Sequence, residues 1–252
     1  MRNQTIGLFI VLLSLIISNR AASSVSTESV DRLKESLVYL TGMDKDGKII
    51  GIIGTGVLLE INNNNYIVTA KHVIITQKGK QKKNIGLIFN TLPGSTHPIH
   101  AISVQELKKQ LEVDWIFHKN KKVDIAIIPF YQSDVRIKIP IKVRITSFND
   151  DLFANEDNYS ELYDVFFLGY QPETYSTNGI KRITPIFRSG IISSINHDGS
   201  LYIDAYSFPG NSGSPVFIRP SAYDGNTGIM SIGKKHFRFL GIVSAYIPYE
   251  EK

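Results

Sequence analysis

The sequence predicts an all-β fold made of two antiparallel β-subdomains, and three observations lead to this prediction. Short runs rich in β-branched and aromatic residues recur along most of the chain, with clusters of turn-forming residues between them. Apolar side chains follow helical spacing in only two short stretches. A polar stretch from Ser147 to Asp164 divides the runs, with about six before it and about five after it. Many short strands with this punctuation favour a sandwich or barrel over alternating βα units.

The first residues have the character of an export signal. Arg2 precedes an apolar run from Ile6 to Ile17, and small polar residues follow that run. Twelve residues are too few to span a bilayer as a helix. We therefore expect residues 1–23 to be a cleaved signal peptide and the mature protein to be exported, either periplasmic or secreted, without stable membrane insertion. An uncleaved amphipathic anchor is the alternative.

The remaining elements follow in chain order. A helix is predicted directly after the signal, because Val30, Leu33 and Leu37 recur at helical spacing. A second helix is predicted from Ser103 to Glu112, where apolar residues again line one face. The predicted strands are the runs LVYLTG, KIIGIIGTGVLLEI, NYIVTA, NIGLIF, HPIHAI, DIAIIPF, YDVFFLGY, PIFRSGIISSI, LYIDAY, SPVFI and HFRFLGIVSAYI. Residues 24–150 are expected to form the first β-subdomain and residues 151–252 the second.

The composition excludes several kinds of site. The chain has no cysteine, which rules out a thiol nucleophile, a thiolate metal site and disulfides. Its net charge of +5 includes two short basic clusters, KGKQKK and HKNKK, which we interpret as solvated loops and not as a nucleic-acid surface. His97 and His100 could suggest a metal pair, but their spacing does not place both on one strand face and no carboxylate cluster accompanies them. No metal or other cofactor is expected.

Ser212 is the candidate nucleophile. It lies in FPGNSGSPVF, where two glycines surround the serine and apolar residues follow at once. Gly210 allows the backbone to turn so that its N–H and the N–H of Ser212 point into one small volume, as an oxyanion hole requires. Gly213 permits close approach of the following strand. Taken alone, the same letters are compatible with a plain glycine-rich turn.

Two further segments supply the partners that a serine nucleophile needs. His72, in YIVTAKHVI, follows a β-run and is the candidate general base, although a surface histidine would fit that segment alone. Asp124 opens the apolar run of KKVDIAIIPF, where a buried carboxylate requires partners. Asp114 is the rival carboxylate, in a less apolar context. The chain order His, Asp, Ser differs from that of α/β-hydrolases and subtilisins.

These segments, together with GTGVLLE, FFLGYQPE and FLGIVSAYI, resemble successive landmarks of the trypsin-like serine peptidases. Within that family the closest resemblance is to the bacterial branch with the HtrA/Deg proteases and glutamyl endopeptidases, here without a PDZ domain. The resemblance implies two six-stranded antiparallel β-barrels, with His72 as base, Asp124 as its orienting carboxylate and Ser212 as nucleophile. It implies that Ser244 hydrogen-bonds the buried aspartate and lines the cleft. Asn211 replaces the aspartate of many digestive enzymes, so the oxyanion hole is expected to form without zymogen cleavage.

The resemblance also gives expectations about the substrate. The residues expected to bind the substrate are Tyr206, Ser207, Ser244, Ala245 and Tyr246. Tyr206 takes the position of the pocket aspartate of trypsins, and Val243 takes that of the histidine of glutamyl endopeptidases. Cleavage after Lys, Arg or Glu is therefore not expected, and a small or apolar side chain is the default.

The expected function is that of a serine endopeptidase that acts on polypeptides through an acyl-enzyme on Ser212, without a cofactor. Family members continue past the GIVSA strand with another strand and usually a helix, whereas this chain stops at Lys252, so the second barrel is expected to be truncated. The alternative is a weak or inactive peptide-binding module on the same fold. The sequence does not indicate an oligomeric state.

Overall fold

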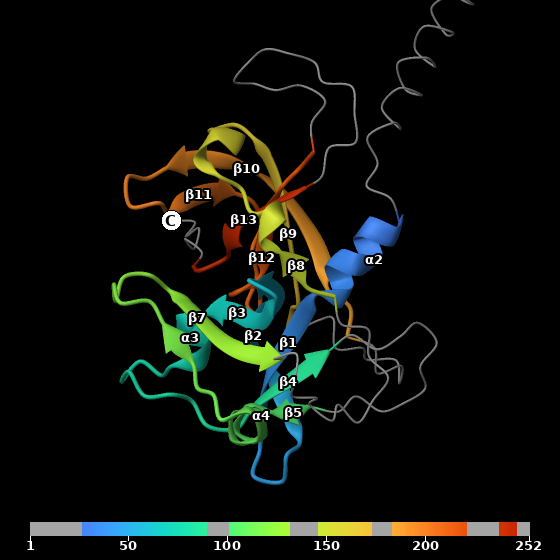
Figure 1. Cartoon of the computed structure of the whole chain (residues 1–252), viewed down its shortest axis with the longest axis vertical. Coiled ribbons are helices and arrows are strands. Elements are labelled where there is room, and N and C mark those ends of the chain that lie inside the picture. Colours follow the sequence, from blue (N-terminus) through green and yellow to red (C-terminus); the bar gives the residue numbers. More distant parts are fainter. Residues whose placement is uncertain (1–26, 90–100, 132–145, 173–182, 221–236, 246–252) are drawn as a thin grey trace, which may run out of the picture.

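The computed structural model describes residues 27–89, 101–131, 146–172, 183–220 and 237–245, and strands dominate these residues (Figure 1). The helices are α2 (Thr27–Glu35), α3 (Lys71–Ile74) and α4 (Val104–Leu111), with two short 3-10 turns, Asp150–Leu152 and Glu156–Asn158. The strands are β1 (Leu37–Met43), β2 (Ile49–Ile61), β3 (Asn64–Ala70), β4 (Ile85–Phe89), β5 (Ile102–Ser103), β6 (Ile116–Phe117), β7 (Ile125–Tyr131), β8 (Phe148–Asn149), β9 (Asp164–Gly169), β10 (Ile186–Ile195), β11 (Leu201–Asp204), β12 (Pro215–Ile218) and β13 (Arg238–Ile242).

The first sheet contains eight strands, in the order β5-β4-β1-β2-β3-β7-β6, with β8 paired to β2. Its neighbours are antiparallel, except that β8 runs parallel to β2. The β2–β3 hairpin has a two-residue turn in which Asn62 and Asn63 have φ angles of 51° and 61°. Asparagine tolerates this left-handed conformation, which the type I′ hairpin turn needs. The asparagine run therefore sets the register that carries β3 toward His72.

The second sheet contains five antiparallel strands, in the order β11-β10-β9-β12-β13. Successive side chains in these strands point to opposite faces of the sheet. In β9, Val165 and Phe167 pack into one buried cluster, and Phe166 and Leu168 pack into another. Both faces of this strand are therefore covered by apolar side chains, which explains its nearly unbroken hydrophobic sequence.

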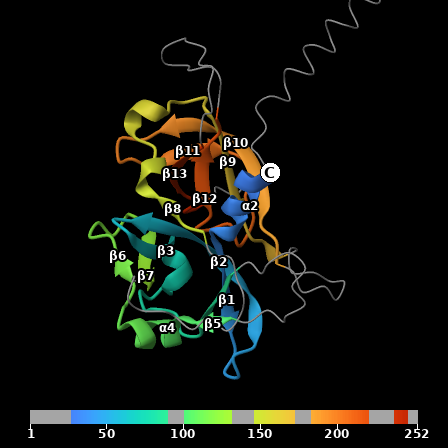
Figure 2. The same cartoon turned by 45° about the vertical axis from the view of Figure 1, so that its right-hand side comes forward.

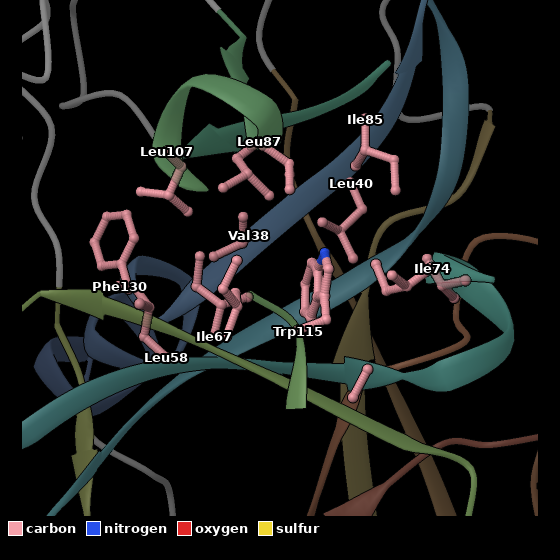
Figure 3. Packing of buried hydrophobic residues seen from close by; sticks show 14 of the residues in the cluster. Val38, Leu40, Leu58, Ile67, Ile74, Ile85, Leu87, Leu107, Trp115 and Phe130 are labelled. Carbon is pink, nitrogen blue, oxygen red and sulfur yellow. The ribbon is translucent and has the colours of Figure 1, made fainter. Parts of the chain in front are cut away.

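One core lies within the first sheet (Figure 3). It contains Val38 and Leu40 of β1, together with Leu107 from α4 and Trp115. The alternate residues of β1, Leu37 and Tyr39, point to the other face. Complete burial of each such side chain stabilises the fold by about 1.5–3 kcal/mol, so this core secures the scaffold that presents β3 and β7.

A second apolar core lies between the two sheets and sets the position of one sheet relative to the other. It combines Tyr39 and Val57 of the first sheet with Phe166 and Phe217 of the second. The rings of Tyr39 and Tyr170 meet edge to face, with their centroids 5.1 Å apart. Figures 1 and 2 show the sheets lying against one another along this core, with α2 beside the second sheet. The Lys34 ammonium of α2 lies 6.0 Å from the ring centroid of Phe187 on β10.

The prediction of an all-β fold with two antiparallel units is confirmed, and both predicted helices are present as α2 and α4. The Ser103 hydroxyl caps α4 by accepting a hydrogen bond from the Gln105 N–H, 3.2 Å away. Leu37 was placed in the first helix by its spacing, but it opens β1. The helix ends before it because the Ser36 hydroxyl donates to the Leu33 carbonyl at 2.8 Å.

Two expectations concern segments outside the described residues, namely the signal peptide at residues 1–23 and the end of the second barrel from residue 246 onward. No helix within the described parts of the chain has the length and apolar character needed to cross a membrane.

Candidate active site

His72 lies in the first turn of α3, directly after β3 ends at Ala70. Its ring nitrogen Nδ1 is 2.7 Å from the Asp124 Oδ2, and its backbone N–H donates to the Asp124 Oδ1 at 2.9 Å. A carboxylate only accepts hydrogen bonds, so the ring proton belongs on Nδ1. This tautomer leaves Nε2 as a proton acceptor on a side chain that is 50% exposed.

Asp124 immediately precedes β7, and its side chain is mostly covered, with 22% exposure. Burial acts to raise the pKa of this carboxyl group. The hydrogen bonds from the His72 ring, the His72 backbone N–H and the Ser244 hydroxyl outweigh burial and hold the pKa below its usual value. Asp124 therefore stays ionised beside the imidazole.

Asp114, the rival carboxylate, lies elsewhere. Its Oδ1 is 2.6 Å from the Lys108 ammonium of α4 and also accepts a hydrogen bond from the Gln81 side chain at 3.2 Å. The structure thus brings Asp124 to His72 and pairs Asp114 with a lysine. An ion pair with such partners at the surface accounts for Asp114 without any role in the site.

Ser212 occupies a tight turn between β11 and β12 in which two glycines are required. Gly210 and Gly213 have φ angles of 95° and 85°, which side-chain-bearing residues rarely adopt. A Cβ atom on Gly213 would lie 2.0 Å from the Thr55 carbonyl oxygen and 3.0 Å from the Ala70 nitrogen. The turn is therefore packed against the end of β3, two residues before His72.

The backbone N–H groups of this turn divide into bonded and free ones. Asn211 donates to the Phe208 carbonyl at 3.0 Å, Gly213 to the Val243 carbonyl at 2.7 Å, and Ser214 to the Asn211 carbonyl at 2.9 Å. Among the described residues, the N–H groups of Gly210 and Ser212 have no acceptor. They are the same two groups that the sequence predicted for an oxyanion hole.

The Asn211 side chain is buried beneath the turn and stabilises it through hydrogen bonds. It is 2% exposed. In the carboxamide orientation that satisfies its neighbours, Nδ2 donates to the Tyr170 carbonyl at 3.2 Å and Oδ1 accepts from the Phe208 N–H at 3.1 Å. The Arg188 guanidinium covers the Phe208 ring at 4.5 Å. Asn211 thus makes neutral hydrogen bonds here and no ion pair.

The Ser212 hydroxyl and the His72 ring form no hydrogen bond within the described structure. Hydrogen bonds between the two sheets instead position the segments that carry Ser212 and His72. The Ser244 hydroxyl, which follows β13, donates to the Asp124 Oδ2 at 2.8 Å. The Thr55 N–H of β2 donates to the Ser212 carbonyl at 2.8 Å.

The sequence did not single out three residues that touch the site. Thr55 was quoted only as part of a motif, and a threonine between two glycines in an apolar run is a signal that could have found it. The Lys71 ammonium donates to the carbonyls of Lys121 and Val123 at 2.7 and 3.1 Å, which holds the loop before Asp124. The Lys82 ammonium donates to the His72 carbonyl at 3.1 Å, and burial lowers the pKa of Lys82.

The predicted substrate-binding residues are distributed unevenly. Tyr206 is 82% exposed, so its side chain lines no closed pocket among the described residues. Ser207 and Ser244 are half-buried and Ala245 is exposed. Tyr246 lies outside the described residues.

His97 and His100, the pair weighed as metal ligands in the sequence, both lie outside the described residues. Within the described part of the chain, no group of three or more histidine, aspartate or glutamate side chains is arranged to hold a metal ion.

Comparison with known proteins gives one family and a distant structural similarity. Residues 54–220, more than half of the chain, match the model of the trypsin-like peptidase domain. The search of curated proteins gives no match. Among solved structures, the chain is similar to the serine endoprotease from Yersinia pestis, with a TM-score of 0.43 and 19% identity over 78% of this chain and 55% of that chain. The chain thus matches about half the length of that protein.

Proposed function

The chain belongs to the trypsin-like peptidase family of serine endopeptidases, and from this premise we propose that it cleaves peptide bonds through an acyl-enzyme on Ser212. The observation that carries the proposal is the paired His72 and Asp124, with the Asp124 carboxylate bound by both the ring and the backbone of His72. This pairing orients the imidazole so that Nε2 can accept a proton.

The proposed reaction has two halves. The Ser212 hydroxyl gives its proton to Nε2 of His72 while its oxygen attacks the substrate carbonyl. The negative oxygen of the tetrahedral intermediate accepts hydrogen bonds from the free N–H groups of Gly210 and Ser212. The imidazolium then protonates the departing amine, and water hydrolyses the ester by the same route in reverse.

Two features of the site support these steps. The ionised Asp124 stabilises the imidazolium that forms during each half, and its lowered pKa keeps it charged while His72 accepts the proton. Proton transfer requires a hydrogen bond between the Ser212 hydroxyl and the His72 ring, which is absent among the described residues. Such bonds are commonly loose without substrate and tighten when it binds.

The test is labelling with a fluorophosphonate, which reacts with an activated serine. We expect the wild type to be labelled once per chain, and Ser212→Ala to lose labelling together with about 10⁶-fold in kcat, the scale seen when a nucleophile is removed. Ser214→Ala, two residues along the same turn, is the matched control and should still be labelled. Equal labelling of wild type and Ser212→Ala would disprove the assignment.

The same experiment addresses the second candidate function. A peptide-binding module is favoured by the missing hydrogen bond between Ser212 and His72. Wild-type protein that binds extended peptides but takes up no fluorophosphonate would support that module. We also propose that residues 1–23 direct export. Sequencing the N-terminus of the protein recovered outside the cytoplasm would contradict this if Met1 were still present.

A further inference from the structure

Thr55 lies in the middle of β2 and has no solvent exposure, yet its hydrogen bonds go mainly to the other sheet. Its hydroxyl donates to the Gly210 carbonyl at 2.8 Å and accepts from the Tyr170 N–H at 3.0 Å. Its own N–H donates to the Ser212 carbonyl at 2.8 Å. One residue of the first sheet thus holds two carbonyls of the serine turn.

These two carbonyls flank the peptide that carries the Ser212 N–H. Between them, the Asn211 carbonyl accepts from the Ser214 N–H at 2.9 Å. A trans peptide points its C=O and N–H in opposite directions, so this bond turns the Ser212 N–H away from Ser214. With the units on either side held by Thr55, the peptide between them cannot rotate without breaking one of these bonds.

The packing around Thr55 leaves this arrangement little freedom. A Cβ atom on Gly54 would lie 2.7 Å from Val73, beside His72, and 3.1 Å from the Ser212 carbonyl oxygen. The Thr55 carbonyl accepts from the Thr69 hydroxyl at 2.7 Å and faces Gly213. Thr55 is therefore held on both sides by glycines and by a second buried threonine.

We infer that Thr55 is a positioning residue for the oxyanion hole: its hydroxyl and its backbone N–H hold the peptide units on either side of the one that carries the Ser212 N–H, and so fix the direction of that N–H from across the sheet interface. The inference rests on the proposed function, because it concerns the geometry of the oxyanion hole that the proposed reaction needs. It also explains how a turn without an ion pair at Asn211 keeps one conformation. The Thr55 hydroxyl thus both accepts a hydrogen bond, from the Tyr170 N–H, and donates one, to the Gly210 carbonyl.

The decisive variant is Thr55→Val, which keeps the side-chain volume and the backbone N–H but removes the hydroxyl. We expect kcat on a fluorogenic peptide to fall by about 10- to 100-fold while KM changes by less than about twofold, because a misplaced donor affects the transition state more than binding. Thr55→Ser restores the hydroxyl and should return kcat to within about threefold of wild type.

Thr41→Val is the matched control. Thr41 is equally buried, on β1, and its hydroxyl donates to the Gly51 carbonyl at 2.7 Å within the same sheet. We expect this variant to lose thermal stability but to keep kcat. An equal loss of kcat in Thr41→Val and Thr55→Val would overturn the inference, because it would mean that any lost buried hydroxyl has the same effect.

A second readout does not depend on catalysis. In the Ser212→Ala background, hydrogen exchange of the Asn211 and Gly213 amides should be faster with Thr55→Val and unchanged with Thr41→Val. If Thr55→Val does not fold, Thr55→Ala, which leaves room for a water molecule, should show the same changes in smaller degree. Unchanged exchange and unchanged kcat would overturn the inference. Absence of fluorophosphonate labelling in the wild type, with the exchange result intact, would instead overturn only the proposed function.

Discussion

The two sheets hold their parts of the candidate site in different ways. In the first sheet the working groups are side chains, and His72 and Asp124 mainly hold one another at the surface. In the second sheet the Ser212 turn is held through its backbone, and Gly213 is packed against Thr55 with no room for a side chain. Chemistry can therefore be removed from the first region while the fold is kept. In the second region, replacing a glycine of the turn changes chemistry and fold together.

Among the variants that test this comparison, the largest effect is expected from Asp124→Asn, which addresses its first half. The amide keeps the shape of the carboxylate but favours the wrong histidine tautomer, so kcat/KM should fall by about 10³- to 10⁴-fold. Asp124→Asn removes the ionised carboxylate, so the free energy of unfolding at pH 7 should fall by the contribution of that charge while the protein stays folded. Asp114→Asn, which removes the charge paired with Lys108, is the control and should keep its activity. A loss below about tenfold in Asp124→Asn would show that Asp124 does not orient the base.

Gly213→Ala tests the second half. The new Cβ atom would meet the Thr55 carbonyl at a φ angle of 85°, so we expect a loss of more than about 3 kcal/mol in the free energy of unfolding, together with loss of activity. Gly199→Ala is a close control, because Gly199 has a φ of 81° but nothing within 4 Å of the added atom. That variant should lose only about 1 kcal/mol. Equal losses in the two variants would mean that backbone conformation, and not packing against the first sheet, determines the cost.

Acid titration gives a further test of the first region, through the pH dependence of its stability. The pKa of Asp124 is lower in the folded protein than in the unfolded chain, so its contribution to stability is complete above the unfolded value of about 3.9 and is lost as the pH falls through the folded value. Between pH 5 and pH 3, urea unfolding of the wild type should therefore lose more free energy than that of Asp124→Asn. The other carboxyl groups are common to both proteins, so parallel curves would contradict the assigned shift.

The smallest effect concerns Ser214, whose fully buried hydroxyl has no hydrogen-bond partner among the described residues. Ser214→Ala removes an unsatisfied polar group, so we expect the free energy of unfolding to stay unchanged or rise by up to about 1 kcal/mol. Ser36→Ala is the control, since the equally buried Ser36 hydroxyl donates to the Leu33 carbonyl, and it should lose about 1 kcal/mol. Destabilisation of both variants by the same amount would mean that the Ser214 hydroxyl has an unseen partner.

Much of the fold could be predicted because its signals are local. The runs of apolar, β-branched and aromatic residues in β1 and β9, the asparagine turn before β3 and the serine cap of α4 depend only on neighbours in the chain. Leu37 fitted both the helical spacing and the predicted strand LVYLTG, because spacing alone does not show where a side-chain hydrogen bond ends a helix. The one-turn helix α3 around His72 was missed, since four residues are too few to establish a helical period.

The sequence by itself determined the chemical inventory: a serine between glycines, a histidine after a strand and an aspartate before one, with no cysteine. It also determined the two-unit β architecture, because strand patterns are read from residues next to one another. The tertiary structure brought Asp124 to His72, paired Asp114 with Lys108, and brought Thr55 to the Gly210 and Ser212 carbonyls. The Asp124 contact depends on the pairing of β3 with β7, and the Thr55 contacts depend on the apolar core between the two sheets. Neither long-range arrangement has a signature in any single stretch of the chain.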